Sequence, residues 1–162
     1  MLPQDEIPAR TENRQGFFHQ LRYCGTVESA ELIYNLRDFE QSGMERRTKQ
    51  LENAAQVLND RYGPNTVTLS FTEEYRNMGE ILMQHPQLIE KARTACELAG
   101  VEPKCAIARG GTDGARLSFA GVPCPNLGIG GWAYHSSKEH ITVETMDQVS
   151  NILEQLVYQF AQ

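Results

Sequence analysis

Two glycine-rich segments hold the residues whose types and spacing could support chemistry. The first, Arg109-Gly-Gly-Thr-Asp-Gly114, lies between a predicted strand and a predicted helix. Glycine-rich turns at such a junction can present backbone N–H groups to an anion, and a guanidinium on the same loop can bind a carboxylate through two hydrogen bonds. The spacing matches neither GxGxxG nor GxxxxGK followed by Ser or Thr, which argues against a nucleotide site. Carboxylate binding and a merely tight turn both remain open.

The second segment, Gly130 to His140 with the sequence GGWAYHSSKEH, contains His135 and His140. A histidine on a loop after a buried strand can be a metal ligand, a proton shuttle or a surface residue. His19 falls on a predicted strand surface and His85 just before a predicted helix. Because one histidine makes no metal site and no HExxH pattern occurs, spacing alone leaves the role of His135 open.

The cysteines point to no metal or disulfide framework. They are far apart in the sequence, and none belongs to a CxxC pair. We expect small buried apolar side chains, because a nucleophilic thiol would need a nearby base that the sequence does not show. The four are Cys24, Cys96, Cys105 and Cys124.

Composition sets the broad class of this 162-residue chain. It is 40% hydrophobic and 22% charged, with a net charge of −6 and a pI of about 5.2. This acidic balance argues against a dedicated nucleic-acid or acidic-membrane binder, since either would present a basic face. No apolar run approaches the roughly 20 residues that span a bilayer, and the N-terminus lacks the apolar core of a secretory signal. We therefore expect a cytoplasmic protein without a nucleic-acid or membrane partner.

The first half of the chain predicts most of a small two-layer α+β domain. Residues 1–15 are polar, contain two prolines and predict an extended or disordered lead-in. Residues 17–27 and 32–37 predict an antiparallel hairpin. A helical period follows and ends at Gly63-Pro64, and residues 66–72 alternate cleanly between apolar and hydroxyl side chains, which predicts a further strand. Strand-strand-helix-strand is an incomplete sandwich, since such a fold usually has a second helix.

The second half predicts an α/β arrangement that is also incomplete. Pro86 begins a helix that Gly100 closes, residues 115–119 form a short helix, and a sharp helical period spans Met146 to Phe160 with Thr142 or Thr145 as its cap. Short strands are expected at residues 104–108 and 126–129. Two strands between helices do not make a parallel sheet with both faces covered.

Several motifs in order resemble one enzyme family. The tract RGGTDGARLSFAGVPCPNLGIGGWAYHSSKEHITVETM, from Arg109 to Met146, resembles the C-terminal signature of bacterial peptidase T, a zinc-dependent tripeptide aminopeptidase of the aminoacylase and carboxypeptidase G clan. Upstream, RTENRQGFFH, GTVE, YNLRDFE and YRNM resemble the same family in the same order. The match covers residues 7–162.

This resemblance implies a fold and an incomplete active site. It implies a partial lid or dimerisation domain over residues 16–80, followed by the C-terminal portion of an α/β zinc-peptidase catalytic domain over residues 81–162. The family's two-zinc site takes its His-x-Asp motif, its bridging Asp and its Glu-Glu pair from a region that precedes this tract. No catalytic residue is therefore expected in the chain, and tight zinc binding by the chain alone is not expected.

The resemblance also implies three site residues. Arg37 in YNLRDFE and Arg109 in RGGTDG match arginines that bind the C-terminal carboxylate of the substrate in this family, and His135 matches its last zinc ligand. The family commonly has Gly-Lys-His-Glu after that histidine, whereas this sequence has Ser136-Ser137-Lys138-Glu139 with the spacing to the glutamate kept. His140 falls where an apolar aromatic residue is usual, so it is not assigned as a ligand.

These expectations leave two functions open. The chain is either the C-terminal portion of a peptidase T-like enzyme, inactive by itself, or a non-catalytic remnant that oligomerises or binds a carboxylate ligand. The expected partners are short peptides with a free C-terminal carboxylate and either a second copy of the chain or a missing N-terminal half. A nucleotide-binding domain is the least favoured alternative.

Overall fold

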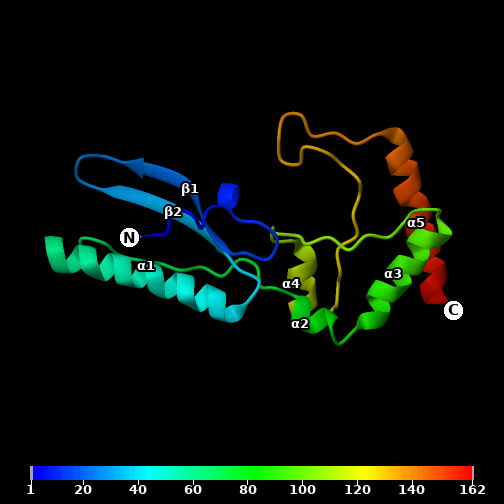
Figure 1. The fold of residues 1–162 in the computed structure, drawn as a ribbon, viewed down its shortest axis with the longest axis horizontal. Helices are drawn as coiled ribbons and strands as arrows, with labels where there is room; N and C mark the ends of the chain where they lie inside the picture. Colours follow the sequence, from blue (N-terminus) through cyan, green and yellow to red (C-terminus); the bar gives the residue numbers. More distant parts are fainter. Residues whose placement is uncertain (1, 162) are drawn as a thin grey trace. The chain divides into compact units, whose positions relative to one another are not determined.

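The computed structural model describes residues 2–161 as a mixed α+β structure (Figure 1). Its order is a 3-10 turn at Pro8–Arg10, strands β1 and β2, and helices α1 to α5. The chain divides into two compact units. The first runs up to Glu74 and takes in Ile107–Gly110, and the second holds Tyr75–Ala106 together with the residues from Gly111 onwards.

The predicted hairpin is confirmed in the first unit. β1 (Phe17–Gly25) pairs antiparallel with β2 (Ala30–Arg37), from Phe17 opposite Arg37 to Gly25 opposite Ala30, with an irregularity between Gln20 and Arg22. At the turn the Thr26 hydroxyl accepts hydrogen bonds from the backbone N–H groups of Glu28 and Ser29, both at 3.3 Å. A short side chain that bonds to its own turn favours this tight connection.

The predicted helix after the hairpin is α1 (Gln41–Tyr62). Before it, the Asp38 carboxylate accepts from the backbone N–H of Glu40 at 3.0 Å, which turns the chain out of β2. Gly63, at φ +108°, ends the helix as expected, since such a backbone conformation disfavours other residues and Pro64 cannot continue the helix.

The strand predicted at residues 66–72 is wrong. Within the described chain, residues 66–78 form neither strand nor helix, and Leu69 and Phe71 are 42% and 51% exposed. The Asn59 side chain on α1 takes both backbone groups of Val67, accepting from its N–H at 2.8 Å and donating to its carbonyl at 3.0 Å. A strand needs a neighbouring backbone for its hydrogen bonds, and the sheet that the structure describes consists of β1 and β2.

The lead-in is a packed segment rather than a simple extended one. A 3-10 turn at Pro8–Arg10 interrupts it, and the carbonyl of Glu6 accepts from the N–H of Phe18 at 2.8 Å. Thr11 is 8% exposed. The polar composition of this stretch does not reveal these contacts, because they depend on residues far along the chain.

The second unit is built on α3 (Pro86–Leu98) and α5 (Val143–Ala161), which pack together around Ala95 and Ile152. As predicted, Pro86 begins α3 and Gly100 closes it, with the N–H of Val101 donating to the carbonyl of Cys96 at 2.9 Å. Of the two expected caps of α5, Thr142 is the one used: its hydroxyl accepts from the N–H of Thr145 at 3.2 Å.

The rest of the second unit is less regular than predicted. α4 (Asp113–Phe119) matches the expected short helix, and α2 (Gly79–Leu82) is an additional one. The strands expected at residues 104–108 and 126–129 are not formed in the described chain. Their apolar residues include Ile107 and Ile129, which are 47% and 52% exposed. A short apolar run has strand potential, but it becomes a strand only beside a partner.

Much apolar surface is accessible in both units. The accessible surface is 12,223 Å², whereas two separate compact units of about 9 kDa would together expose about 9,800 Å². Large side chains that are half exposed or more include Tyr23, Phe71, Val157 and Phe160. Exposed apolar side chains of this size are typical of faces that a further polypeptide covers.

Candidate functional site

Arg37 lies at the end of β2, where the hairpin meets the lead-in. It is directly opposite Phe17, whose side chain is buried, and is itself partly buried. The strand pairing therefore fixes where its backbone lies relative to the first residue of β1.

Arg109 reaches the same end of the hairpin from a distant part of the sequence. Its Nη1 donates to the Thr11 carbonyl at 2.5 Å, and its Nη2 donates to the Thr11 hydroxyl at 2.7 Å and to the Gln15 carbonyl at 3.1 Å. The guanidinium also lies over the Phe17 ring, 4.8 Å from its centroid. Both arginines that the sequence singles out are thus neighbours of Phe17.

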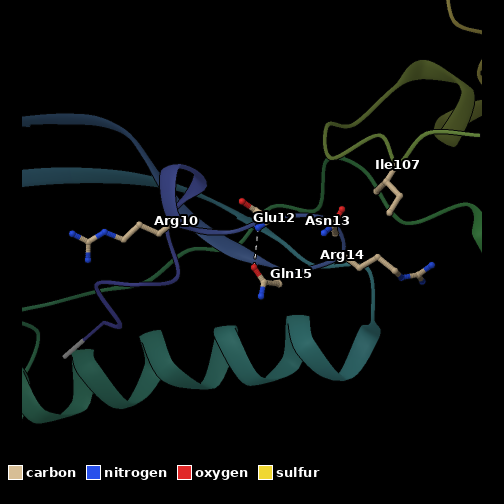
Figure 2. A pocket seen from close by; sticks show the side chains of 6 residues that line it. All are labelled: Arg10, Glu12, Asn13, Arg14, Gln15 and Ile107. Atoms are coloured by element: carbon tan, nitrogen blue, oxygen red, sulfur yellow. Dashed lines mark hydrogen bonds between the residues drawn. The ribbon is translucent and has the colours of Figure 1, made fainter.

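Beside this region is an open hollow of about 760 Å³ lined by residues of the lead-in and Ile107 (Figure 2). The backbone N–H of Glu12 donates to Gln15 Oε1 at 2.8 Å and so closes a small turn. Figure 2 shows the side chains of Arg10 and Arg14 pointing in opposite directions, and Arg14 is paired with Glu40 at 3.3 Å. These two arginines do not converge on one ligand.

An ion-pair network that the sequence analysis missed lies close to Arg37. The Arg47 side chain, 3% exposed, pairs with Asp38 and with Glu6, the latter at 2.6 Å, and donates to the Gly43 carbonyl at 3.2 Å. Arg46 pairs with Glu6 at 2.9 Å. The network joins the lead-in, the end of β2 and the first turns of α1.

The signal for this network was the position of Arg47 on the apolar face of α1. It falls between Met44 and Leu51 at helical spacing, where an apolar residue would otherwise be expected. A charged residue at a core position is buried only when it is paired. A Cβ at Gly43 would overlap the Asp38 carboxylate, so the network also needs this glycine.

The same network perturbs the titration of Glu6. Hydrogen bonds from Arg46 hold the pKa of Glu6 below its usual value, and the positive charges of Arg47 and Arg46 act in the same direction, whereas partial burial opposes them. The pairing with Glu6 likewise raises the pKa of Arg46. Glu6 is therefore a carboxylate at neutral pH.

His135 belongs to an exposed loop of the second unit. Trp132 and His140 form an isolated antiparallel bridge at the ends of this loop, and the His135 backbone lies in the left-handed region at φ +62°. Its N–H donates to Glu139 at 2.8 Å, which gives a local role to the glutamate whose spacing is kept. His140 Nδ1 lies 2.8 Å from the Lys138 carbonyl.

His135 by itself does not make a zinc site. Among residues 2–161 no group of three or more His, Cys, Asp or Glu side chains lies together in a way that could hold a metal ion. Structural and catalytic zinc sites need at least three protein ligands. Within residues 2–161, His135 is therefore not joined by the further ligands that a zinc site needs.

The cysteines differ from the expectation of buried apolar residues. All four are free thiols, Cys24 and Cys105 are exposed, and Cys96 and Cys124 are half-buried.

None of the helices within the described residues is long and apolar enough to cross a membrane.

The relatives found by comparison with known proteins share one name, although the search of family models found no match. A protein named peptidase T from Halothermothrix orenii is 41% identical over 161 residues, which is 99% of this chain and 40% of that protein. Peptidase T from Vibrio cholerae is 42% identical over 156 residues, covering 96% of this chain and 38% of the relative. Peptidase T from Clostridium perfringens is 38% identical over 162 residues, covering 100% and 40%.

The chain thus spans about two fifths of the length of the curated relatives that it matches. Identity at this level over nearly every residue is far more specific than either glycine-rich segment taken alone. Along essentially its whole length, the chain is similar to the C-terminal part of peptidase T.

Proposed function

We propose that this chain is the carboxylate-binding part of a peptidase T-like peptide hydrolase. The observation that carries the proposal is the 38–42% identity to proteins named peptidase T over nearly the whole chain. The position of Arg37 and Arg109 beside Phe17 supports it. In this proposal the two guanidinium groups bind the C-terminal carboxylate of a short peptide, which fixes its far end and limits substrate length.

The complete enzyme would act in the cytoplasm and release the N-terminal residue of tripeptides. Two zinc ions would supply an activated water, with His135 as one of their ligands and the others contributed by a region outside this sequence. Because His135 alone cannot hold them, we propose that the chain by itself does not hydrolyse peptides and binds zinc no more than adventitiously.

The alternative is a non-catalytic protein that binds a carboxylate ligand or assembles with copies of itself. One observation supports this alternative. Arg109, the proposed carboxylate-binding residue, is held by contacts with distant residues, whereas His135, the proposed zinc ligand, bonds to nearby Glu139 on its own loop. The two functions differ in whether the chain can support hydrolysis when the rest of an enzyme is supplied.

A chimera tests this difference. The corresponding part of Vibrio cholerae peptidase T would be replaced by this chain, and the hydrolysis of trialanine followed beside the isolated chain. We expect the chimera to be active and the isolated chain to be inactive. A chimera that folds, as judged by circular dichroism and gel filtration, but does not cleave trialanine would contradict the enzymatic proposal.

The role of Arg37 is tested in the same chimera. Arg37→Ala should lower kcat/KM for trialanine by one to two decades, since a charged hydrogen bond contributes about 1.5–3 kcal/mol. The loss should be smaller for trialanine amide, and Arg22→Ala, an exposed arginine on β1, should change neither. Equal losses on the acid and the amide would refute the carboxylate contact.

A further inference from the structure

Most hydrogen-bond donors of Arg109 are already used within the chain. A guanidinium has five N–H donors, and three of them go to Thr11 and Gln15. A fourth, Nε, is buried and has no hydrogen-bond partner among the described residues. One donor on Nη1 is left, so a carboxylate cannot bind through two hydrogen bonds while the lead-in keeps its place.

Thr11 is oriented so that it accepts two hydrogen bonds from Arg109. Its hydroxyl donates to the Ile7 carbonyl at 2.9 Å, which turns the oxygen lone pairs toward the guanidinium. Its own carbonyl accepts from Nη1, so hydroxyl and carbonyl oxygens together present two acceptors to Arg109, as a carboxylate does. Thr11 and Arg109 are 98 residues apart in sequence, and helix or strand pairing does not account for this contact.

The turn that carries these acceptors lies at the surface of the first unit. Glu12, Asn13, Arg14 and Gln15 are exposed, and the turn is closed by its own hydrogen bonds from Glu12 to Gln15 and back. The hollow in Figure 2 lies along it and offers about 760 Å³ of open space. Thr11 is the buried residue of this stretch, at 8% exposed.

We propose that residues 11–15 form an internal latch on Arg109, in which Thr11 and Gln15 occupy the guanidinium until a ligand carboxylate displaces them. This inference rests on the proposed function, since it concerns the ligand of the same arginine. Displacement is favourable because a carboxylate brings a full negative charge to the guanidinium, whereas the Thr11 and Gln15 oxygens are neutral. The apparent affinity for the ligand is then the intrinsic affinity multiplied by the fraction of molecules in which the latch is open.

The opposite role for Thr11 would be to hold Arg109 ready for its ligand. The two roles predict opposite signs. If Thr11 only positions Arg109, removing its hydroxyl weakens carboxylate binding; if it competes with the ligand, removing the hydroxyl tightens binding. Stability falls in both cases, so stability alone does not separate them.

The experiment measures binding of trialanine and trialanine amide to the full chain by isothermal titration calorimetry. Thr11→Val keeps the shape of the side chain and removes the hydroxyl acceptor, and Thr11→Ser keeps that hydroxyl as the matched control. We expect Thr11→Val to bind trialanine about fivefold more tightly than the wild type. This is the effect expected when the ligand has one hydrogen bond fewer to displace from Arg109. Thr11→Ser should bind trialanine as the wild type does. Trialanine amide should bind the wild type and both variants with the same affinity.

A second measurement uses the unmodified chain and does not depend on how well the variant folds. Cleavage by trypsin after the exposed Arg14 should become faster at saturating trialanine, because Thr11 and Gln15 no longer hold the turn against Arg109. Unchanged or slower cleavage after Arg14, or unchanged or weaker binding by Thr11→Val, would overturn the latch. If wild type and variant bind the acid no better than the amide, the proposed carboxylate site itself fails, and the latch fails with it.

Discussion

Two parts of the first unit contrast in how their side chains find partners. At the base of the hairpin, the end where Phe17 pairs with Arg37, Arg47 and Arg109 are held by contacts with residues far away in sequence. In residues 66–72, a cleaner pattern of alternating apolar residues leaves Leu69 and Phe71 about half exposed. The clear strand pattern of residues 66–72 thus did not lead to a strand, because a strand forms only beside a neighbouring backbone. The buried arginines, in contrast, are held because a buried charge requires partners.

The largest effect is expected at the hairpin base. Arg47→Met should lower the free energy of unfolding by about 3–5 kcal/mol, because it leaves Asp38 and Glu6 without their buried cation. Urea unfolding followed by circular dichroism measures the loss, and hydrogen exchange of the β1 and β2 amides locates it in the first unit.

The matched control for this prediction is Arg46→Met. Arg46 also pairs with Glu6, but its side chain is 49% exposed, and exposed pairs contribute about 0–1 kcal/mol. If the two methionine variants were equally stable, the buried network would not hold the hairpin base.

The second prediction concerns residues 66–72. We expect the isolated chain to form a dimer or larger assembly, through this segment or the hairpin, because exposed apolar side chains such as Leu69 and Phe71 favour association. Phe71→Lys should shift the mass measured by light scattering at several protein concentrations toward that of the 18.3 kDa chain.

Val122→Lys is the control for this second variant. Val122 is 58% exposed in the other unit, so it tests whether any added charge reduces association. A wild-type chain that stays monomeric and does not bind a hydrophobic dye would contradict the prediction.

What the sequence could predict follows from the range of the interactions involved. The hairpin and the helices α1, α3, α4 and α5 follow from local patterns, and Pro86, Gly63 and Gly100 mark helix ends through their own backbone preferences. The predictions of short strands were wrong because a strand forms only when a second backbone lies beside it. The contact between Arg109 and Thr11 was out of reach for the same reason, since nothing near either residue in sequence points to the other.

The candidate site divides in the same way. Motif resemblance singled out Arg37, Arg109 and His135, and the fold brings the first two to Phe17. The Arg47 network had a sequence signal, a charge on an apolar helix face, but its partners Glu6 and Asp38 lie on other elements. Physical reading of a sequence can therefore mark a buried charge before it can say what pairs with it.

The smallest expected effect is a pH dependence at the hairpin base. The pKa of Glu6 is lower in the folded chain than in the unfolded chain, mainly through the hydrogen bonds from Arg46. The unfolded chain therefore binds its proton first as the pH falls, and the stabilisation by Glu6 is complete above about pH 5 and lost as the pH drops through the folded pKa. Because Glu6 is partly exposed, water screens the pair and the contribution should stay below about 1 kcal/mol. Glu6→Gln should flatten the fall in unfolding free energy between about pH 5 and pH 3 in urea titrations, whereas Glu12→Gln, an exposed glutamate of the same lead-in, should leave the wild-type slope. An unchanged slope in Glu6→Gln would mean that Glu6 does not contribute to the network in solution.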